Sequence, residues 1–167
     1  MAKAKNPVPE GLHTVTPHLV IDGAARAIEW YKKAFGAEQR GESALGPDGK
    51  VMHAEVRIGN SVIYLNDVMM GAKDPKACGG SPVSLWVYVP DCDAVFNRAV
   101  AAGGANTSGP MGKMSDQFWG DRAGTLTDPF GYQWTIATRK EDLSGEEMKK
   151  RADEFMKSFA NQQPAHA

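Results

Sequence analysis

Hydrophobic positions along the chain follow two spacings, one typical of helices and one typical of strands. The first helical pattern predicts a helix from about Gly23 to Phe35, and Gly36 after it favours a helix end. Its apolar face comprises Ala24, Ala27, Ile28, Tyr31 and Phe35. Around this helix, apolar or alternating runs predict strands over about residues 14–21, 38–43, 51–58 and 61–66. Gly59-Asn60 joins the last two runs as a tight hairpin turn.

The second half of the chain repeats this order. A strand over about 83–89 precedes a helix that Asp91 caps and that runs to about Ala102. The apolar face of this helix comprises Val95, Phe96, Ala99 and Val100. A strand near residue 106, a long loop over 109–121 and a hairpin over 124–138 follow. The helix-ending glycines of the two halves lie 68 residues apart and the hairpin glycines 72 apart. We therefore infer a duplicated βαβββ unit, and such units pack together or swap with a second chain to close a core.

These elements give the organisation of the chain. We expect one domain over residues 12–140, with its first module over 12–66, a linker over 67–81 and its second module over 82–140. A further helix is predicted over 141–160, because Ser144 and Glu147 form a capping box. The apolar face of that helix comprises Met148, Ala152, Phe155 and Phe159. Segments 1–11 and 161–167 have no periodicity and are expected to be flexible tails.

Composition and charge exclude several classes of protein. The 167 residues carry a net charge of −1, which argues against a nucleic-acid partner. No apolar run approaches the roughly 18 residues of a membrane span, and the start of the chain lacks the apolar stretch of a signal peptide. Cys78 and Cys92 have no ligand-like spacing, which argues against a disulfide scaffold or a structural zinc site. We expect a cytoplasmic protein with no membrane partner.

Two segments at opposite ends of this repeat resemble family motifs. Residues 21–38 read IDGAARAIEWYKKAFGAE and resemble the D-x-x-x-A-x-x-F-Y-x-x-x-L-G-A signature of the vicinal oxygen chelate superfamily. Residues 120–134 read GDRAGTLTDPFGYQW and resemble the DP-x-G-(Y/H) hairpin that closes the second module of that superfamily. The superfamily includes glyoxalase I, extradiol dioxygenases and bleomycin resistance proteins. Residues 52–67 and 117–122 are most similar to its PhnB-like subgroup.

The resemblance implies a fold and a place for a ligand. The expected fold class is α+β, with two βαβββ modules forming a curved, mainly antiparallel mixed sheet, helices on its outer face and the additional C-terminal helix. The cup inside the sheet is the family's ligand site, and members usually form dimers. We therefore expect a small-molecule ligand and a homodimer whose cups are each completed by the paired module, with Trp119 and Arg122 at the rim.

The resemblance also locates the family's four metal-ligand positions. In this sequence they fall on Val15, Tyr64, Ser84 and Thr135, of which none is a His, Glu or Gln. Valine has no donor atom, and neutral hydroxyls are weak ligands for divalent metals. We therefore expect these side chains to point into the cup without holding a metal. The prediction is a protein with no cofactor; the alternative is a divalent metal ion at a non-standard site.

Several residues could still carry chemistry or bind a ligand. His53, Glu55 and Arg57 alternate along one predicted strand and so share a face, where His53 and Glu55 are the candidate acid and base. The competing interpretation is an ordinary solvated strand face. The predicted ligand-binding residues are Glu55, Arg57, Tyr64, Trp86, Tyr88, Trp119 and Arg122.

The second module supplies the aromatic candidates. Trp86 and Tyr88 alternate with Ser84 and would offer flat apolar faces to a ligand with a ring, although core packing would explain them equally well. Trp119 lies in a loop, where core packing explains a tryptophan less easily. Arg122 is expected to hold a carboxylate or phosphonate of the ligand, or else to pair with Asp121 or Asp128.

Three functions remain open at this point. The first is a metal-free protein that binds a small, partly aromatic or anionic molecule in its cup. The second is an enzyme of the lyase, isomerase, transferase or dioxygenase type, working through an altered metal site or through His53 and Glu55. The third is a dimeric scaffold whose cup has lost its function. Fold alone does not decide between them.

Overall fold

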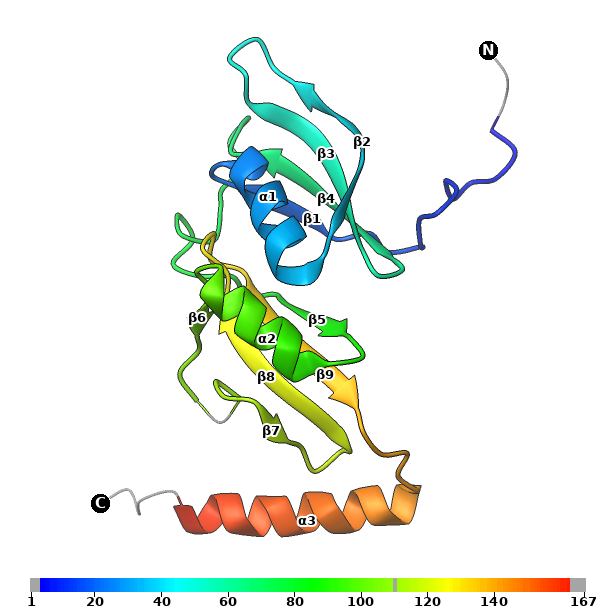
Figure 1. Ribbon diagram of the computed structural model, residues 1–167, viewed down its shortest axis with the longest axis vertical. Helices are drawn as coiled ribbons and strands as arrows, with labels where there is room; N and C mark the ends of the chain where they lie inside the picture. Colours follow the sequence, from blue (N-terminus) through cyan, green and yellow to red (C-terminus); the bar gives the residue numbers. More distant parts are fainter. Residues whose placement is uncertain (1–3, 110, 163–167) are drawn as a thin grey trace.

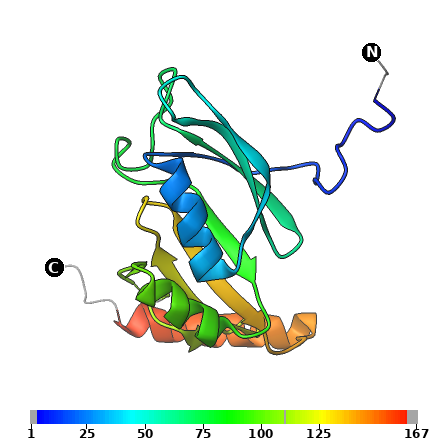
Figure 2. The same ribbon diagram turned by 45° about the horizontal axis from the view of Figure 1, so that its top comes forward.

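The chain forms two βαβββ modules stacked along its long axis, followed by a separate C-terminal helix (Figures 1 and 2). The computed structural model describes residues 4–109 and 111–162, with the backbone alone from 159 onward. Module one contains β1 (His18–Ile21), α1 (Ala24–Phe35), β2 (Glu38–Leu45), β3 (Val51–Ile58) and β4 (Ser61–Asp67). Module two contains β5 (Ser84–Tyr88), α2 (Cys92–Ala101), β6 (Ala105–Asn106), β7 (Ser115–Asp116), β8 (Asp121–Thr127) and β9 (Gln133–Arg139). Helix α3 (Gly145–Gln162) follows.

Each module builds its own sheet around a parallel crossover. In module one the strand order is β1-β4-β3-β2, and in module two it is β5-β9-β8-β6, with β7 on the edge of β8. The β1–β4 and β5–β9 pairs are parallel and all the other pairs are antiparallel. The predicted fold class and duplicated unit are therefore confirmed.

The strands form two sheets rather than the single sheet that was expected. A side chain explains the break. The hydroxyl of Tyr132 lies on the outer edge of β1, where it accepts a hydrogen bond from the Val20 amide at 3.1 Å and donates one to the Val20 carbonyl at 3.0 Å. Module two therefore contacts this edge through a side chain instead of continuing the backbone ladder.

Helix α1 begins at a carboxylate that belongs to β4. Asp67 Oδ1 accepts hydrogen bonds from the amides of Gly23 and Ala24, at 2.9 and 2.8 Å, while Oδ2 accepts one from Val51 at 2.7 Å. An anion is stabilised by the free N–H groups of a helix N-terminus. Gly36 ends the helix in the left-handed conformation that glycine adopts without strain.

The two modules are joined through α1, α2 and a buried carboxylate. Asp128, which is 4% exposed, lies in the turn between β8 and β9. Its Oδ2 accepts hydrogen bonds from Tyr31 Oη of α1 at 2.8 Å and from Trp134 Nε1 of β9 at 2.9 Å. Its Oδ1 accepts hydrogen bonds from the backbone amides of the turn residues Phe130 and Tyr132, both at 2.9 Å. All four donors are satisfied by one side chain.

Helix-to-helix hydrogen bonds strengthen the same junction. Trp30 Nε1 donates to the carbonyl of Ala102 and Arg98 Nε donates to the carbonyl of Ala34, both at 2.9 Å. The predicted apolar face of α1 is buried here, and so are Phe96 and Ala99 of α2. Val100 is exposed, contrary to expectation, because it lies off the stripe of α2 that faces the sheet.

Helix α3 lies across the end of module two, away from module one (Figure 1). Ser144 Oγ accepts a hydrogen bond from the backbone amide of Glu147 at 3.1 Å. This contact confirms the role of Ser144 in the predicted capping box. Arg151 donates to both oxygens of Glu141 at 3.1 and 2.7 Å. Phe159, expected on the apolar face, has a side chain outside the described residues.

The expected boundaries differ from the observed ones in a few places. The first strand begins at His18 rather than near residue 14, and the predicted loop over 109–121 contains β7. Residues 4–11 of the expected N-terminal tail form no helix or strand, whereas 161 and 162 of the expected C-terminal tail belong to α3. Residues 1–3 and 163–167 lie outside the described residues.

Asp128→Asn should lower the free energy of unfolding by about 2 to 4 kcal/mol, because one amide nitrogen would replace an acceptor that serves both Tyr31 and Trp134. Equilibrium unfolding in urea measures this change. Asp48→Asn, in an exposed turn, is the control and should change stability by less than about 0.5 kcal/mol. Equal stability of the two variants would contradict the role given to Asp128.

Asp67 should make stability depend on pH in the acid range. Burial alone would raise the pKa of Asp67, but the hydrogen bonds from Ala24, Val51 and Gly23 outweigh it and hold the pKa below its usual value. The carboxylate therefore stabilises the fold fully above the unfolded pKa of about 3.9, and this contribution is lost as the pH falls through the lower folded pKa.

The test compares Asp67→Asn with the wild type in urea at several pH values. Near neutral pH the variant should be less stable by about 1 to 2 kcal/mol. The difference should shrink below about pH 4. Asp22→Asn, an exposed neighbour at the start of α1, should show no such trend. A pH-independent difference for Asp67→Asn would contradict the explanation.

Candidate ligand-binding site

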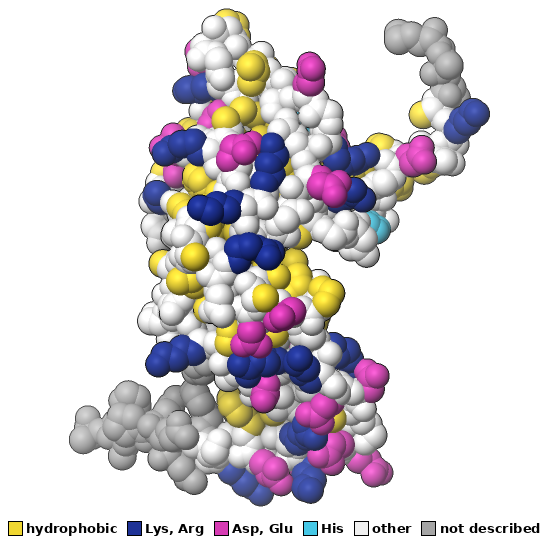
Figure 3. Space-filling model, viewed as in Figure 1, with side chains coloured by type: hydrophobic (Ala, Val, Ile, Leu, Met, Phe, Trp, Pro, Cys, Tyr) yellow, Lys and Arg dark blue, Asp and Glu magenta, His cyan; other side chains and the backbone are white. Residues whose placement is uncertain are grey.

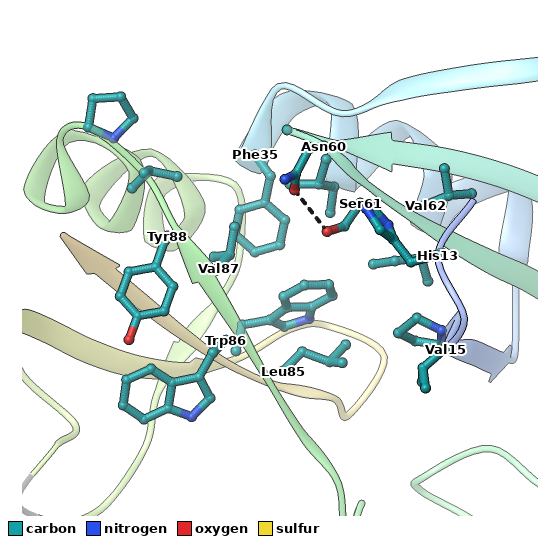
Figure 4. A pocket seen from close by; sticks show the side chains of 17 residues that line it. His13, Val15, Phe35, Asn60, Ser61, Val62, Leu85, Trp86, Val87 and Tyr88 are labelled. Carbon is teal, nitrogen blue, oxygen red and sulfur yellow. Dashed lines mark hydrogen bonds between the residues drawn. The ribbon is translucent and has the colours of Figure 1, made fainter. Parts of the chain in front are cut away.

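Strand β5 presents two aromatic side chains on the side of the sheet that faces away from α2. Trp86 is 44% exposed and Tyr88 is 59% exposed, whereas Val87 between them is buried against the core. The register pairs Trp86 with Thr135 and Tyr88 with Ala137 on β9. The two rings lie side by side, with centroids 6.2 Å apart (Figure 4). Core packing therefore does not account for them.

Trp119 extends this surface from the turn before β8. Its ring lies 6.2 Å from that of Trp86, and its Nε1 donates to Asp121 Oδ2 at 3.0 Å. Tyr88 Oη donates to the same oxygen at 2.9 Å. We call Trp86, Tyr88 and Trp119 the aromatic face. The structure thus brings together the three aromatic residues of module two that the sequence predicted to bind a ligand.

Asp121 is a site residue that the sequence analysis considered only as a partner for Arg122. It is 2% exposed, and its Oδ1 is buried without a hydrogen-bond partner among the described residues. Partial burial and then the hydrogen bond to Asp121 raise the pKa of the Tyr88 hydroxyl. The sequence did contain a signal for the position of Asp121. Asp121 alternates with Ala123 and Thr125 on a strand, so its side chain lies on the same face as Thr135 and Trp86.

The turn that carries Trp119 is held from behind by α3. The ring of Phe118 meets Trp119 edge to face at 5.0 Å, and Phe155 of α3 lies 5.0 Å from Phe118. Gly120 has φ +94°, and a Cβ at this position would lie 2.8 Å from the carbonyl oxygen of Glu141. The close approach allows the amides of Lys140 and Glu141 to donate to the carbonyl of Gly120. The C-terminal helix therefore helps to set the position of one wall of the site.

Module one presents a polar face with a different character. We call His18, His53, Glu55, Arg57 and Tyr64 the polar face. His53 Nε2 lies 3.5 Å from Glu55 Oε1, and its ring lies 4.8 Å from that of Tyr64. His18 lies on β1 next to Tyr64, with ring centroids 6.3 Å apart. The predicted alternation of His53, Glu55 and Arg57 on one face fits these contacts.

The charged groups of the polar face are already paired across strands. Arg40 Nη1 donates to Glu55 Oε2 at 3.0 Å, and Arg57 pairs with Glu38, its register partner on β2. The hydrogen bond from Arg40 occupies one of the two oxygens of Glu55. Such ion pairs are typical of a solvated strand face. His53 and Glu55 are connected only by the 3.5 Å contact between Nε2 and Oε1.

Arg122 lies on the opposite side of its sheet from the aromatic face. Its Nε and Nη2 donate to the two carboxylate oxygens of Asp93 on α2, at 2.7 and 2.8 Å, and its Nη1 donates to Asp116 at 3.2 Å. These hydrogen bonds raise the pKa of Arg122 and lower that of Asp93. The expected rim position with Trp119 is therefore wrong, and so are the expected alternative partners Asp121 and Asp128. An alternating strand turns adjacent residues to opposite faces, so Arg122 and Asp121 cannot both face the cup.

The four family metal positions do not form a donor set suited to a divalent metal. Val15 lies before β1, is 80% exposed and offers no donor atom. Thr135 is buried, and its hydroxyl already shares a 2.8 Å hydrogen bond with Thr125. Tyr64 belongs to the sheet of module one, while Ser84 and Thr135 belong to that of module two. Among residues 4–109 and 111–162, no three His, Cys, Asp or Glu side chains are grouped so as to hold a metal ion.

A groove between the modules leads to the aromatic face. It has a cavity volume of about 880 Å³ and runs between the N-terminal segment, the β3–β4 hairpin and β5. Trp86 and Tyr88 border it, together with Phe35, Val62 and Val15 (Figure 4). In Figure 3 the surface is hollowed between the modules, with hydrophobic side chains along part of the hollow. The groove is large enough for a small organic molecule.

Comparisons with known proteins assign the chain to a family. Residues 11–136 match the model of the glyoxalase/bleomycin resistance protein/dioxygenase superfamily, and the chain belongs to this superfamily. An uncharacterised protein of Mycobacterium tuberculosis is 41% identical over 139 residues, covering 80% of this chain and 79% of that protein. The solved structure of an Arabidopsis thaliana gene product is 27% identical, with a TM-score of 0.61, and covers 75% of this chain and 98% of that one.

Two further solved structures share the fold at lower identity. A PhnB protein from Bacillus cereus is 20% identical with a TM-score of 0.57, over 75% of this chain and 99% of that one. A bleomycin-binding protein in complex with bleomycin is 17% identical with a TM-score of 0.53, over 78% and 99% of the two chains. These neighbours share the fold, and the family model confirms the expected superfamily. The family match ends at residue 136, so α3 lies outside the matched residues.

Phe155→Ala should loosen Trp119, because it removes the ring that supports Phe118. Amide-type hydrogen exchange of the Trp119 indole N–H, assigned in NMR spectra by comparison with Trp119→Phe, should become faster. Met156→Ala on the exposed side of α3 is the control and should leave this exchange unchanged. Unchanged exchange in both variants would show that α3 does not support the aromatic face.

Proposed function

We propose that this protein binds a small molecule with a flat aromatic ring on the aromatic face, without the metal that enzymes of its superfamily commonly use. The exposure of Trp86 and Tyr88 on a sheet face, beside a groove of about 880 Å³, is the observation that carries this proposal. Large aromatic side chains exposed in a concave surface are typical of ligand sites. The solved bleomycin-binding relative, which holds a small molecule on the same fold, supports it further.

The proposed ligand class differs from the sequence-based one in its charge. The sequence left a partly aromatic or anionic molecule open, with Arg122 as the anion anchor. Arg122 is held by Asp93 and Asp116 on the helix side of the sheet. It is therefore not placed to bind an anionic group of a ligand on the aromatic face. The aromatic part retains all three of its residues: Trp86, Tyr88 and Trp119.

We further propose that a second copy of the chain completes the cup. The aromatic face and the polar face belong to separate sheets, and each is one wall of a curved site. Exposed strand edges favour pairing with another chain, and β5 is an edge strand of its sheet. In a homodimer with exchanged modules, the polar face of one chain would stand opposite the aromatic face of the other. Glu55, Arg57 and Tyr64 would then also line the ligand site.

Acid–base or altered-metal catalysis at His53 and Glu55 is the alternative function. Their 3.5 Å contact is the feature in its favour, and the Arg40–Glu55 pair is the feature against it. The proposed location is the cytoplasm, because Cys78 and Cys92 are both free thiols and reducing compartments preserve thiols.

Binding is tested with flat bicyclic aromatic compounds by thermal stabilisation and calorimetry. A ligand at 100 times its Kd should add about 2.7 kcal/mol to the free energy of unfolding. Trp86→Ala should weaken binding about tenfold, and Val83→Ala, an exposed residue beside β5, should not. Binding that survives Trp86→Ala unchanged would contradict the proposed site.

Two further measurements separate the parts of the proposal. Sedimentation at micromolar concentration should give a dimer, and a monomer would refute the completed cup. Elemental analysis of protein purified without chelators should give substoichiometric transition metal, whereas one metal per chain lost on His53→Ala would favour the alternative enzyme.

A further inference from the structure

We infer that the aromatic face is selective for organic cations, such as an ammonium or amidinium group attached to a flat ring, and that Asp121 causes this selectivity. The inference rests on the proposed function, because it names the ligand class of the same site. It depends on the buried carboxylate of Asp121 behind the rings, one oxygen of which has no hydrogen-bond donor among the described residues.

The carboxylate of Asp121 has an unusual set of partners. Both of its hydrogen bonds come from rings of the aromatic face, Trp119 Nε1 at 3.0 Å and Tyr88 Oη at 2.9 Å, and both go to Oδ2. Its Oδ1 is buried with no donor within the described residues. Among the residues that the structure describes, no Lys or Arg nitrogen lies within 4.0 Å of the Asp121 carboxylate. Buried carboxylates are normally paired or fully hydrogen-bonded, so the unpartnered Oδ1 of Asp121 is an unusual feature.

The nearest basic side chain on this face is directed elsewhere. Arg139 is the register partner of Asp121 on β9, but its Nε donates to Asp142 Oδ1 at 2.7 Å. Arg139 interacts electrostatically with Asp121 and Tyr88, but it donates a hydrogen bond to neither of them. Among the other basic residues of this region, Arg122 is held on the opposite side of the sheet by Asp93 and Asp116. Lys140 lines a small pocket with Asp121 and Arg122 and interacts electrostatically with Asp93. Within the described residues, no basic side chain is therefore hydrogen-bonded to Asp121.

The hydrogen bonds from Tyr88 and Trp119 allow Asp121 to polarise the rings of the aromatic face. A cation over the face of Trp or Tyr is attracted by the ring quadrupole, most strongly for Trp. A phenol or indole that donates its proton to a carboxylate has a more electron-rich ring, because the bond polarises the donor. Both donors to Asp121 are such rings, and Trp86 lies 6.2 Å from each of them. A ligand cation on this surface would meet three ring faces with a carboxylate behind them, whereas a ligand anion there would be repelled.

The test uses three probes of the same shape and different charge: naphthylmethylammonium, naphthylmethanol and naphthoate. Calorimetry with the full chain should show the cation binding about threefold to tenfold more tightly than the alcohol, and naphthoate binding most weakly. In Asp121→Asn the ratio of the affinity for the cation to the affinity for the alcohol should fall to about one. Asp116→Asn, an exposed carboxylate on the neighbouring strand β7, should keep the wild-type order.

The outcomes distinguish this inference from the proposed function. Equal affinity of the wild type for all three probes, or a preference for naphthoate, would overturn cation selectivity and leave the aromatic site standing. Binding of none of the three probes would overturn the site and the inference together. If Asp121→Asn loses the alcohol as well, the wild-type order of the three probes alone decides, because it does not depend on any variant.

Discussion

The buried carboxylate of Asp128 is the interaction on which the arrangement of the two modules depends. It accepts hydrogen bonds from Tyr31 in module one and from Trp134 in module two, and it also closes the turn that carries it. Burial raises the pKa of Asp128, its hydrogen bonds oppose that rise, and burial followed by the charge of Asp128 raises the pKa of Tyr31. Because each partner would be left unsatisfied without it, Asp128 stabilises this arrangement of the two halves. Trp134 in turn fixes β9, which pairs with β5 and so positions the aromatic face.

The proposed ligand surface is built on this junction and is supported by α3, which lies outside the residues that match the family model. Trp86 and Tyr88 come from a strand, whereas Trp119 comes from a turn held between Phe118, Phe155 and the Gly120–Glu141 contact. Sites on strands are positioned by the sheet, and sites on turns need such supporting contacts. Helix α3 supplies that contact here. In this account the superfamily fold provides the proposed site, while α3 supports the turn that carries Trp119.

The sequence predicted the fold well because periodicity and the repeat are local signals. The apolar stripe of α1, the Asp91 cap and the duplicated order of strands all appear where expected. It predicted the site less completely. Trp86, Tyr88 and Trp119 were recognised, but Arg122 was assigned to the cup when strand alternation turns it toward α2 and Asp93. Asp121 was missed as a site residue because a carboxylate next to an arginine suggests an ion pair, and only three-dimensional structure shows that its partners are rings.

The tryptophans provide the most direct measurement of where a ligand binds. The chain has four: Trp30 and Trp134 are buried at the module junction, and Trp86 and Trp119 belong to the aromatic face. Titration with a flat aromatic compound, followed through the four indole N–H signals by NMR, should shift those of Trp86 and Trp119 and leave those of Trp30 and Trp134 in place. Shifts confined to the polar face around His53 and Tyr64, with all four indole signals unchanged, would contradict the account.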